Sequence, residues 1–414
     1  MSLTYPRGFV FIASLLATFL LLPTSSVRAD VCPATGKVCR MKVNCHLPDC
    51  NCVSEEPPVV MDPVQVPQLV VFAFSGPLNN DSWYHLRRIF DYRGKGSKKR
   101  LNPNDEPITM TLFVSDDGTD HYCRAGEFYR HGHEIGVAGT NSSWSMASRK
   151  PRAWEAAMMG QRANLTKEAK IDEEDIRGMR APSLQAGGDQ QFVGIQYMSN
   201  ETRYKAHVWR PYDSSIAIGE KNVVPLWPYT MDFRVSDVVR PQNRHPVACY
   251  PGVWEVPVQR FYDNYSSAHD FIDDWDSAEN VEMLYYTIAN NFWRHYSTNR
   301  APFVINARTY WFSRDPYALE AIERFIDVLL AHTVKDVYVV SMEQVVEWTK
   351  HPLRLDEIKA SALFKQPTGR KGLMCNMADL NWRGNANGNV MLLIEGGVLL
   401  VLLVVLIARD RSED

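Results

Sequence analysis

The chain has 414 residues, of which 45% are hydrophobic and 22% charged, and its 45 basic and 48 acidic side chains give a formal net charge of −3. This balance excludes a protein whose main task is to bind the phosphates of nucleic acid. The apolar content excludes a disordered acidic or basic tail protein.

The first residues have the order of a secretory signal. Arg7 precedes an apolar run over 9–22, and small residues lead to Ala29. Signal peptides have this sequence of charged, apolar and small-residue regions. We therefore predict a signal over 1–29. The alternative is an N-terminal membrane anchor, for which the apolar run is short.

A small cysteine-rich module is predicted over 30–58. The chain contains eight cysteines, and five of them lie between Cys32 and Cys52. A segment with so little apolar material needs covalent links, and in a secreted chain disulfides are favoured over a zinc site that includes His46. Residues 59–67 are predicted to be a proline-rich linker. The remaining cysteines cannot be paired from the sequence; they are Cys123, Cys249 and Cys375.

From residue 68 onward, apolar runs alternate with segments of helical spacing. The predicted strands are 68–74, 108–114, 133–138, 302–307 and 336–342. The predicted helices are 82–91, 153–170, 279–296 and 316–332, the last preceded by a capping Asp315. Repeated strand–helix order predicts parallel strands with right-handed crossovers, and so an α/β barrel or an open doubly wound sheet.

A second apolar stretch lies near the C-terminus. Residues 390–408 are broken only by Glu395, and they are long enough to cross a bilayer as a helix. A charged end over 409–414 argues against a glycolipid anchor. We predict a juxtamembrane stalk over 376–389, one transmembrane helix over 390–408 and a short cytoplasmic tail. The body would then lie outside the cell, at its surface.

Five Asn-x-Ser/Thr sequons agree with passage through the secretory pathway. The candidate glycosylation sites are Asn80, Asn141, Asn164, Asn200 and Asn264.

Eight segments in one order resemble the invertebrate chitin deacetylases of the polysaccharide deacetylase family, which are NodB-like carbohydrate esterases. The resemblance covers roughly residues 39–375. It implies a distorted (β/α) barrel of fewer than eight strands over 68–375, and zinc-dependent removal of N-acetyl groups in active relatives. The segments are HLPDCNC with QVPQLVVFAF, GHEIGVA, RAPSLQAGGDQQF, RPYDSSI, LWPYTMDF, YPGVWEVPV, RAPFVINARTYWF and DVYVVSMEQVVEW.

The resemblance also shows which chemical groups have changed. The family places a base and a metal-binding Asp together after its first strand, and this chain has Ser75 and Gly76 there. The two His ligands fall on Ala138 and Ser142, and the acid His falls on Arg308. A guanidinium stays protonated and transfers no proton at neutral pH. We therefore predict no intact catalytic set, no metal and no cofactor.

Two other groupings are weaker alternatives. His131 and His133 could join Asp116 and Asp117 in a rebuilt metal site, but HGHEI begins a strand and the family's chemistry lies at strand C-termini. We expect His133 to cap or pack the strand entry. A glycosidase-like carboxylate pair needs a defined separation, which the sequence does not fix; the candidate acids are Asp213, Asp232 and Glu255.

The candidate ligand-binding residues follow from the same resemblance. Arg180 stands where the family's third-motif Arg orients the catalytic Asp; here it would pair with Asp232 or another acid, or bind a polar ligand. Arg308 would bind an anionic sugar or form a salt bridge. Aromatic side chains suit sugar rings, although each is also a candidate for the core. The aromatic candidates are Trp227, Tyr229, Trp254, Tyr310 and Trp311.

The leading hypothesis is a membrane-anchored, catalytically inactive deacetylase-like protein that binds or organises an extracellular polysaccharide, chitin or a related glycan. One alternative is an active metal-dependent N-deacetylase with relocated groups. Another is a cell-surface scaffold for protein partners that does not bind glycan.

Overall fold

The computed structural model describes residues 38–91, 99–139, 146–200, 211–219, 224–235, 245–275, 278–331 and 335–376. Contacts divide the chain into two units, Met1–Leu373 and Met374–Asp414, and the fold below is that of the first. The signal over 1–29, the transmembrane helix over 390–408 and the tail lie outside the described residues, as does the stalk apart from its first residue. Within the part that is described, no helix is both long and apolar enough to span a bilayer.

The centre of the sheet is β1 (Gln68–Gly76), whose first seven residues are buried. On one side β1 pairs in parallel with β10 (Phe303–Arg308). On the other it pairs with β11 (Val337–Val339) at its start and with β2 (Thr111–Val114) at its end. Both faces of β1 are covered, which explains the continuous apolar run in its sequence.

Further strands extend the sheet from β2 in the order β3 (Glu134–Val137), β4 (Gly178–Met179), β5 (Tyr212–Asp213), β7 (Trp254–Glu255) and β6 (Tyr229–Thr230). All pairs are parallel except β6 with β7. Among the described residues β10 and β6 lie at the two ends of the order and do not pair with each other, so the predicted barrel is a curled half-barrel. It contains nine strands rather than fewer than eight, because the short strands from β4 to β7 continue it.

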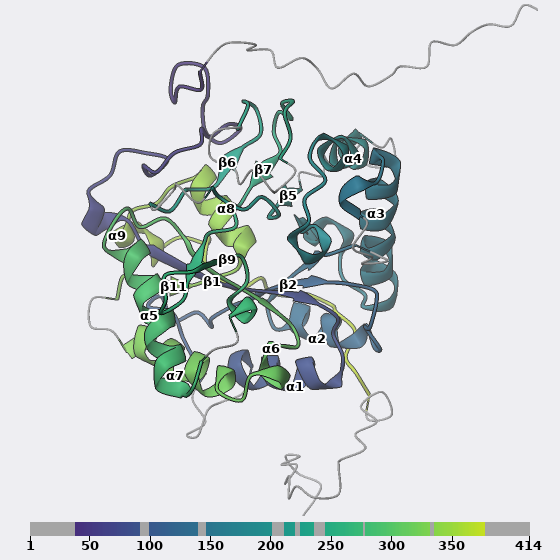
Figure 1. Ribbon diagram of the computed structural model, residues 1–414, viewed down its shortest axis with the longest axis vertical. Helices are drawn as coiled ribbons and strands as arrows, with labels where there is room; N and C mark the ends of the chain where they lie inside the picture. The colour runs from purple at the N-terminus through teal and green to yellow at the C-terminus, as the bar shows by residue number, and fades with distance from the viewer. Residues whose placement is uncertain are drawn as a thin grey trace, which may run out of the picture. The chain divides into compact units, whose positions relative to one another are not determined.

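The two faces of β1 pack against different elements. Leu69, Val71 and Ala73 face a core cluster that includes Val345 and Trp348 of α8 (Met342–Lys350). Phe72 and Phe74 face the other way, with ring centroids 5.5 and 6.1 Å from that of Phe90 in α1 (Asn80–Phe90). Figure 1 shows α1 with α6 (Trp311–Arg314) and α7 (Ala318–Ala331) on one side of β1 and β2, and α8 on the other.

The strands and helices expected from the sequence are confirmed, with ends shifted by up to three residues. Besides α1 and α7, the expected helices are α3 (Pro151–Glu168) and α5 (Val281–Tyr296). Asp315 caps the segment before α7 as predicted, because its Oδ1 accepts from the amide of Tyr317 over 2.8 Å. Helices not foreseen are α2 (Cys123–Arg130), α4 (Asp189–Asn200), α6, α8 and α9 (Leu355–Ile358).

The described part of the N-terminal module is held by disulfides, as predicted. Cys39 bonds to Cys52, and Cys45 bonds to Cys50. The remaining cysteines of the described segments are also disulfide-bonded, and none there is free. The module lies along β6: the amide of Thr230 donates to the carbonyl of Asn51 over 2.9 Å.

The sequons differ in accessibility. Asn264 is exposed in the turn between β8 (Phe261–Tyr262) and β9 (Ala268–His269). Asn80 begins α1 and is partly buried, and the Asn164 amide in α3 donates to Asp116 Oδ1 over 3.3 Å. Asn141 and the side chain of Asn200 lie outside the described residues.

Candidate ligand-binding cleft

An open cavity of about 560 Å³ lies where β1, β2, β3, β4 and β10 end. Ligand sites of parallel α/β folds form at this end of the strands. Four of the five positions that the resemblance aligns with the family's chemical groups line the cavity, and the fifth, Ser142, lies outside the described residues. The lining side chains used below are Ser75, Gly76, Ser115, Ala138, Ser183, Phe271, Asp273, Asp274, Arg308, Tyr310 and Arg314. We call this cavity the cleft.

Arg180 does not face the cleft. It is fully buried after β4, and its guanidinium lies over the ring of Phe113 at 4.2 Å from the centroid. Nη1 donates to Ser75 Oγ over 3.1 Å and Nη2 to Asn306 Oδ1 over 2.8 Å. Nε and Nη2 donate to the carbonyl and hydroxyl of Ser214 over 3.0 and 2.9 Å. Burial lowers the pKa of Arg180 to about 10, so it remains a cation.

The prediction that Arg180 pairs with Asp232 is therefore wrong. The prediction that Arg180 is free to bind a ligand is also wrong. Asp232 Oδ2 instead accepts from the amide of Gly252 over 3.2 Å. The four hydrogen bonds of Arg180 connect the end of β1 with β10 and the segment after β5. Its role in this structure is to join strands inside the half-barrel.

Gly76 occupies a position that only glycine adopts without strain. Its φ is +130°, and a Cβ placed there would lie 2.8 Å from Thr309 Oγ1. The amide of Thr309 donates to the carbonyl of Ser75 over 3.0 Å, which continues the pairing of β1 with β10 at this point. Any side chain at position 76 would therefore be strained by both φ and the contact with Thr309.

Arg308 forms the salt bridge that the sequence left as one of two possibilities. Its Nη1 donates to Asp273 Oδ2 over 2.9 Å and to Asp274 Oδ1 over 2.8 Å, and its amide donates to Asp273 Oδ1 over 3.0 Å. The guanidinium also lies over Phe271, 4.2 Å from the ring centroid. Burial opposes the charge of Arg308, but the two carboxylates raise its pKa above the ordinary value.

The aromatic candidates separate into one cleft residue and four core residues. Tyr310 is 38% exposed and lines the cleft. Trp227 stacks on Trp348 with centroids 5.4 Å apart, and Trp254 belongs to the same buried cluster. The other two are also buried, namely Tyr229 and Trp311. The prediction that these four side chains contact a ligand is therefore wrong. The resemblance indicates that their segments lie near the cleft, but it does not determine the direction in which each side chain points.

The buried acids do not form a glycosidase-like pair. Asp213 and Glu255 face each other in register on β5 and β7 and are fully buried away from the cleft lining. Asp213 accepts from Gln191 Nε2 over 2.8 Å, and Glu255 accepts from the amide of Ile216 over 3.0 Å. Burial raises the pKa of Asp213 to about 6 and that of Glu255 well above its usual range. Through these hydrogen bonds the pair contacts α4 and the segment that follows β5.

The histidine grouping is also separated. His133 is buried at the start of β3, where its Nε2 contacts Asp91 Oδ1 at 3.0 Å and its Nδ1 accepts from the amide of Met110 over 3.3 Å. His131 contacts the other oxygen of Asp91 at 2.9 Å. Asp116 lies elsewhere, accepting from Tyr122 over 2.6 Å. His133 therefore packs the strand entry, as expected.

The described cleft residues do not fit zinc, which takes three or four His, Cys or carboxylate ligands. The acids of the lining are Asp117, Asp273 and Asp274, and the last two already face Arg308. In the part of the chain that the structure covers, the one cluster of three such groups is Cys39, Cys45 and Cys52, whose sulfurs are in disulfides.

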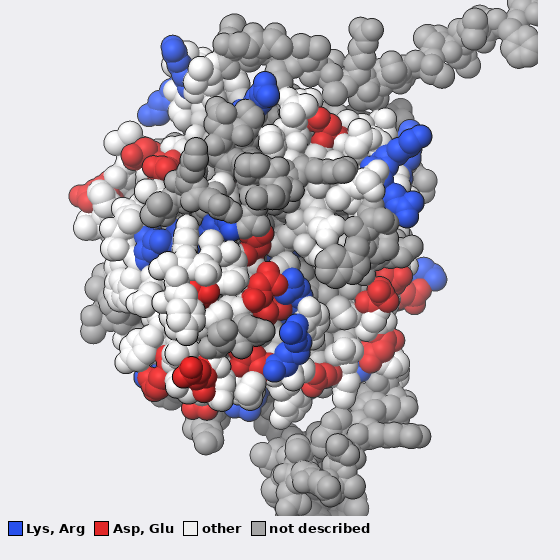
Figure 2. All heavy atoms as spheres, in the orientation of Figure 1, with Lys and Arg blue, Asp and Glu red and all other residues white. Residues whose placement is uncertain are grey.

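Sequence reasoning missed the acids that hold Arg308. They lie in η6 (Ile272–Asp274), within the run FIDDWD, outside every segment of the resemblance. The two adjacent Asp residues were a visible signal, but their partner Arg308 lies more than thirty residues away along the chain. Figure 2 shows acidic and basic side chains interspersed over the face that is drawn, which agrees with the balanced net charge.

A parallel half-barrel with its cleft at the strand C-termini is the class of fold observed. No family model matches the sequence. Two curated proteins of Bombyx mori are similar to it over 330 residues, 76% of this chain: Chitin deacetylase 1 at 31% identity and Chitin deacetylase 8 at 28%. The chain belongs to the chitin-deacetylase-like group of the polysaccharide deacetylase family.

The match spans 57% of the length of the first relative and 79% of the second. Among solved structures, a Mycobacterium smegmatis protein described as a polysaccharide deacetylase has a TM-score of 0.45 and 17% identity, covering 71% of this chain and 93% of its own. The peptidoglycan deacetylase PdaC of Bacillus subtilis has a TM-score of 0.35 and 12% identity, covering 70% of this chain and 94% of its own.

Proposed function

We propose that this protein binds an extracellular N-acetylated polysaccharide, chitin or a related glycan, in the cleft without hydrolysing it. We further propose that residues 390–408 anchor it at the cell surface. The first proposal is supported by a cavity at the strand ends whose described lining residues lack the base, acid and metal ligands that hydrolysis would need. The cavity measures about 560 Å³, while its strand ends carry a serine held by Arg180 and an arginine held by two acids.

Hydrolysis of an N-acetyl group needs an activated water, a base to take its proton and an acid to protonate the leaving amine. Arg308 remains protonated and supplies no proton. Burial raises the pKa of Asp273 while Arg308 opposes this shift, and both oxygens of that carboxylate are already hydrogen-bonded to Arg308. General acid–base help alone is worth roughly 10² to 10⁴ in rate. A protein that lacks both this acid–base help and a metal would have little turnover.

The same lining suits a neutral sugar. Tyr310 offers a ring face for C–H groups and a hydroxyl for hydrogen bonding, and Ser115 and Ser183 add hydroxyls. The charged side chains of the lining carry both signs, and Arg308 is already neutralised by its acids. We therefore favour a neutral ligand over the anionic sugar that the sequence left possible.

The test uses the full-length chain in detergent. Binding of chitohexaose is measured by calorimetry, and acetate release is followed with added zinc or cobalt. We expect binding without acetate release, and about fivefold weaker binding for Tyr310→Ala, since a lost aromatic contact costs about 1 kcal/mol. Tyr265→Ala, at an exposed turn, is the matched control. Metal-dependent acetate release would overturn the claim of inactivity, and absence of any glycan binding would favour a protein-binding scaffold.

A further inference from the structure

The outer face of α5 presents aromatic side chains to solvent. Tyr286 is 57% exposed and Trp293 is 46% exposed, although the helix buries Leu284, Ile288 and Phe292 on its opposite side. Asn290 lies exposed between the two aromatic residues. This arrangement keeps a large apolar area in water. We call the set Tyr286, Asn290 and Trp293 the α5 strip.

The strip is straight because of the helix repeat. Seven residues separate Tyr286 from Trp293, and at 3.6 residues per turn their directions differ by only about 20°. At 1.5 Å per residue the two side chains leave the helix about 10.5 Å apart. The spacing corresponds to two rings of an extended β-linked sugar chain, with Asn290 placed to meet hydroxyls between them.

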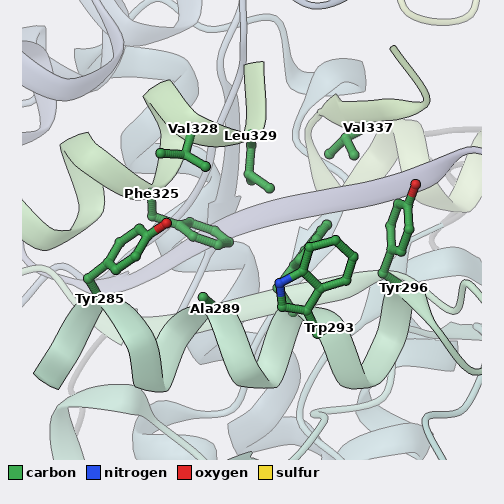
Figure 3. A pocket seen from close by; sticks show the side chains of 9 residues that line it. Tyr285, Ala289, Trp293, Tyr296, Phe325, Val328, Leu329 and Val337 are labelled. Atoms are coloured by element: carbon green, nitrogen blue, oxygen red, sulfur yellow. The ribbon is translucent and has the colours of Figure 1, made fainter. Parts of the chain in front are cut away.

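Neighbouring side chains fix the position of Trp293. Figure 3 shows Tyr285, Trp293 and Tyr296 rising from α5 toward Phe325 and Leu329 of α7. The Tyr296 ring packs edge-on against Trp293, with centroids 5.0 Å apart, and the Tyr296 hydroxyl donates to Asp336 over 2.7 Å. The depression between the helices is about 50 Å³, too small for a sugar ring. The residues that line the depression therefore pack behind the strip, and the depression is not itself the binding site.

The charges around the strip favour a neutral ligand. Glu282, one turn before Tyr286, forms an ion pair with Arg324 of α7. The guanidinium of Arg324 also covers Tyr285, 4.3 Å from its ring centroid. The side chains of the strip are themselves uncharged. An anionic or cationic partner would thus find no opposite charge within the strip.

We infer that the α5 strip is a second polysaccharide-binding surface, outside the cleft, for an extended neutral β-linked chain. Tyr286 and Trp293 stack on alternate rings of the chain and Asn290 donates to a hydroxyl between them. The strip offers two ring faces and one amide, which suit the C–H faces and hydroxyls of sugar rings. This inference rests on the proposed function, because it concerns the same class of polysaccharide.

The experiment separates the two surfaces with full-length protein in detergent. Retention on chitin beads is compared for wild type, Trp293→Ala, Tyr286→Ala and Trp293→Phe. Each alanine variant is expected to bind about tenfold more weakly, whereas Trp293→Phe keeps a ring and most of the binding. Tyr265→Ala is the control for loss of an exposed tyrosine elsewhere. Thermal unfolding of each variant shows that the fold is kept.

The outcomes are distinct for the two proposals. If Tyr310→Ala weakens binding and the alanine variants of the strip do not, the strip inference is overturned while the cleft function stands. If the strip variants lose bead binding and Tyr310→Ala does not, the strip is supported and the cleft function fails. Stacking as the mode of contact would be overturned if Trp293→Phe bound the beads as weakly as Trp293→Ala while both variants kept the stability of the wild type.

Discussion

Arg180 Nη1 donates to Ser75 Oγ over 3.1 Å, so a fully buried cation after β4 meets a hydroxyl at the end of β1. An acidic residue at position 75 would convert this contact into an ion pair. We expect Ser75→Asp to raise the free energy of unfolding at pH 7 by about 1–3 kcal/mol, because hydrogen bonds to charged groups are the stronger ones. Under the proposed function, we expect no acetate release from this variant, since the other positions are unchanged.

The stabilisation in the Ser75→Asp variant would depend on pH. Arg180 would lower the pKa of the introduced carboxyl, so the gain is present above the ordinary Asp value near 4 and is lost as pH falls through the lowered pKa. Urea unfolding at pH 7 and pH 3 measures it, with Ser75→Asn as the neutral control. Equal stability of the two variants at pH 7 would contradict this interpretation of Arg180.

A side chain at position 76 should destabilise the protein. Gly76→Ala and Gly76→Asp both force a residue with Cβ into φ +130° and against Thr309 Oγ1. We expect a loss of about 1–3 kcal/mol in each, measured by chemical denaturation. Thr309→Ala in the Gly76→Ala background should restore only part of it, because the contact is relieved and the φ strain is not. Wild-type stability of Gly76→Ala would show that the turn relaxes freely.

The Arg308–Asp273 contact should appear as a coupling energy. In a double-mutant cycle with Arg308→Ala and Asp273→Asn, we expect about 0.5–3 kcal/mol of interaction, toward the lower end because Arg308 is partly exposed to solvent. The cycle is repeated at low and high salt. An interaction energy near zero in both conditions would mean that this salt bridge does not hold η6 on the end of β10.

Stability should fall with rising pH because of the buried acids. Folding raises the pKa of Asp213 to about 6 and that of Glu255 further above its usual range. The folded protein thus holds protons that the unfolded chain releases above about pH 4, and stability declines as pH rises through about 6. Asp213→Asn should flatten this decline between about pH 4 and pH 6, the interval between the unfolded and folded pKa values, in urea titrations. An unchanged slope would show that the folded protein does not hold a proton on Asp213 in this interval.

Truncation of Trp227 should affect stability and not recognition. Trp227 stacks on Trp348 in the core, so Trp227→Ala is expected to cost about 3–5 kcal/mol. Glycan affinity of the molecules that remain folded should stay within about a factor of two of wild type. Tyr310→Ala should show the reverse pattern. Differential scanning calorimetry and glycan titration on the same samples distinguish the two.

The sequence predicted the strands and helices well where a pattern was long and periodic. The run from 68 to 74 is apolar because β1 is covered on both faces, and α7 shows its helical spacing plainly. The two-residue strands β4 to β7 carry too few residues for any periodicity to appear, so the extent of the sheet was not predictable. The helices α2 and α8 have only eight and nine residues, so each repeats its spacing over little more than two turns.

The site was predictable in position and not in contacts. Alignment by neighbouring residues placed Ser75, Gly76, Ala138 and Arg308 at one end of the sheet, where they line the cleft. The partners of Arg180 and Arg308 come from distant segments, Asn306 and Asp273, that no local pattern connects to them. Side-chain direction near β6 and β7 also depends on the tertiary fold, which explains why Trp227 and Trp254 lie in the core.

The contact between the N-terminal module and β6 has a practical consequence for expression. β6 is the last strand of its sheet, and Asn51 covers it through Thr230 and Pro228. A shortened chain that begins at Gln68 would leave that backbone edge open, and open edges recruit strands from other molecules. Such a truncation would self-associate and precipitate, so recombinant work on this protein requires the cystine-linked segment to be retained and oxidised.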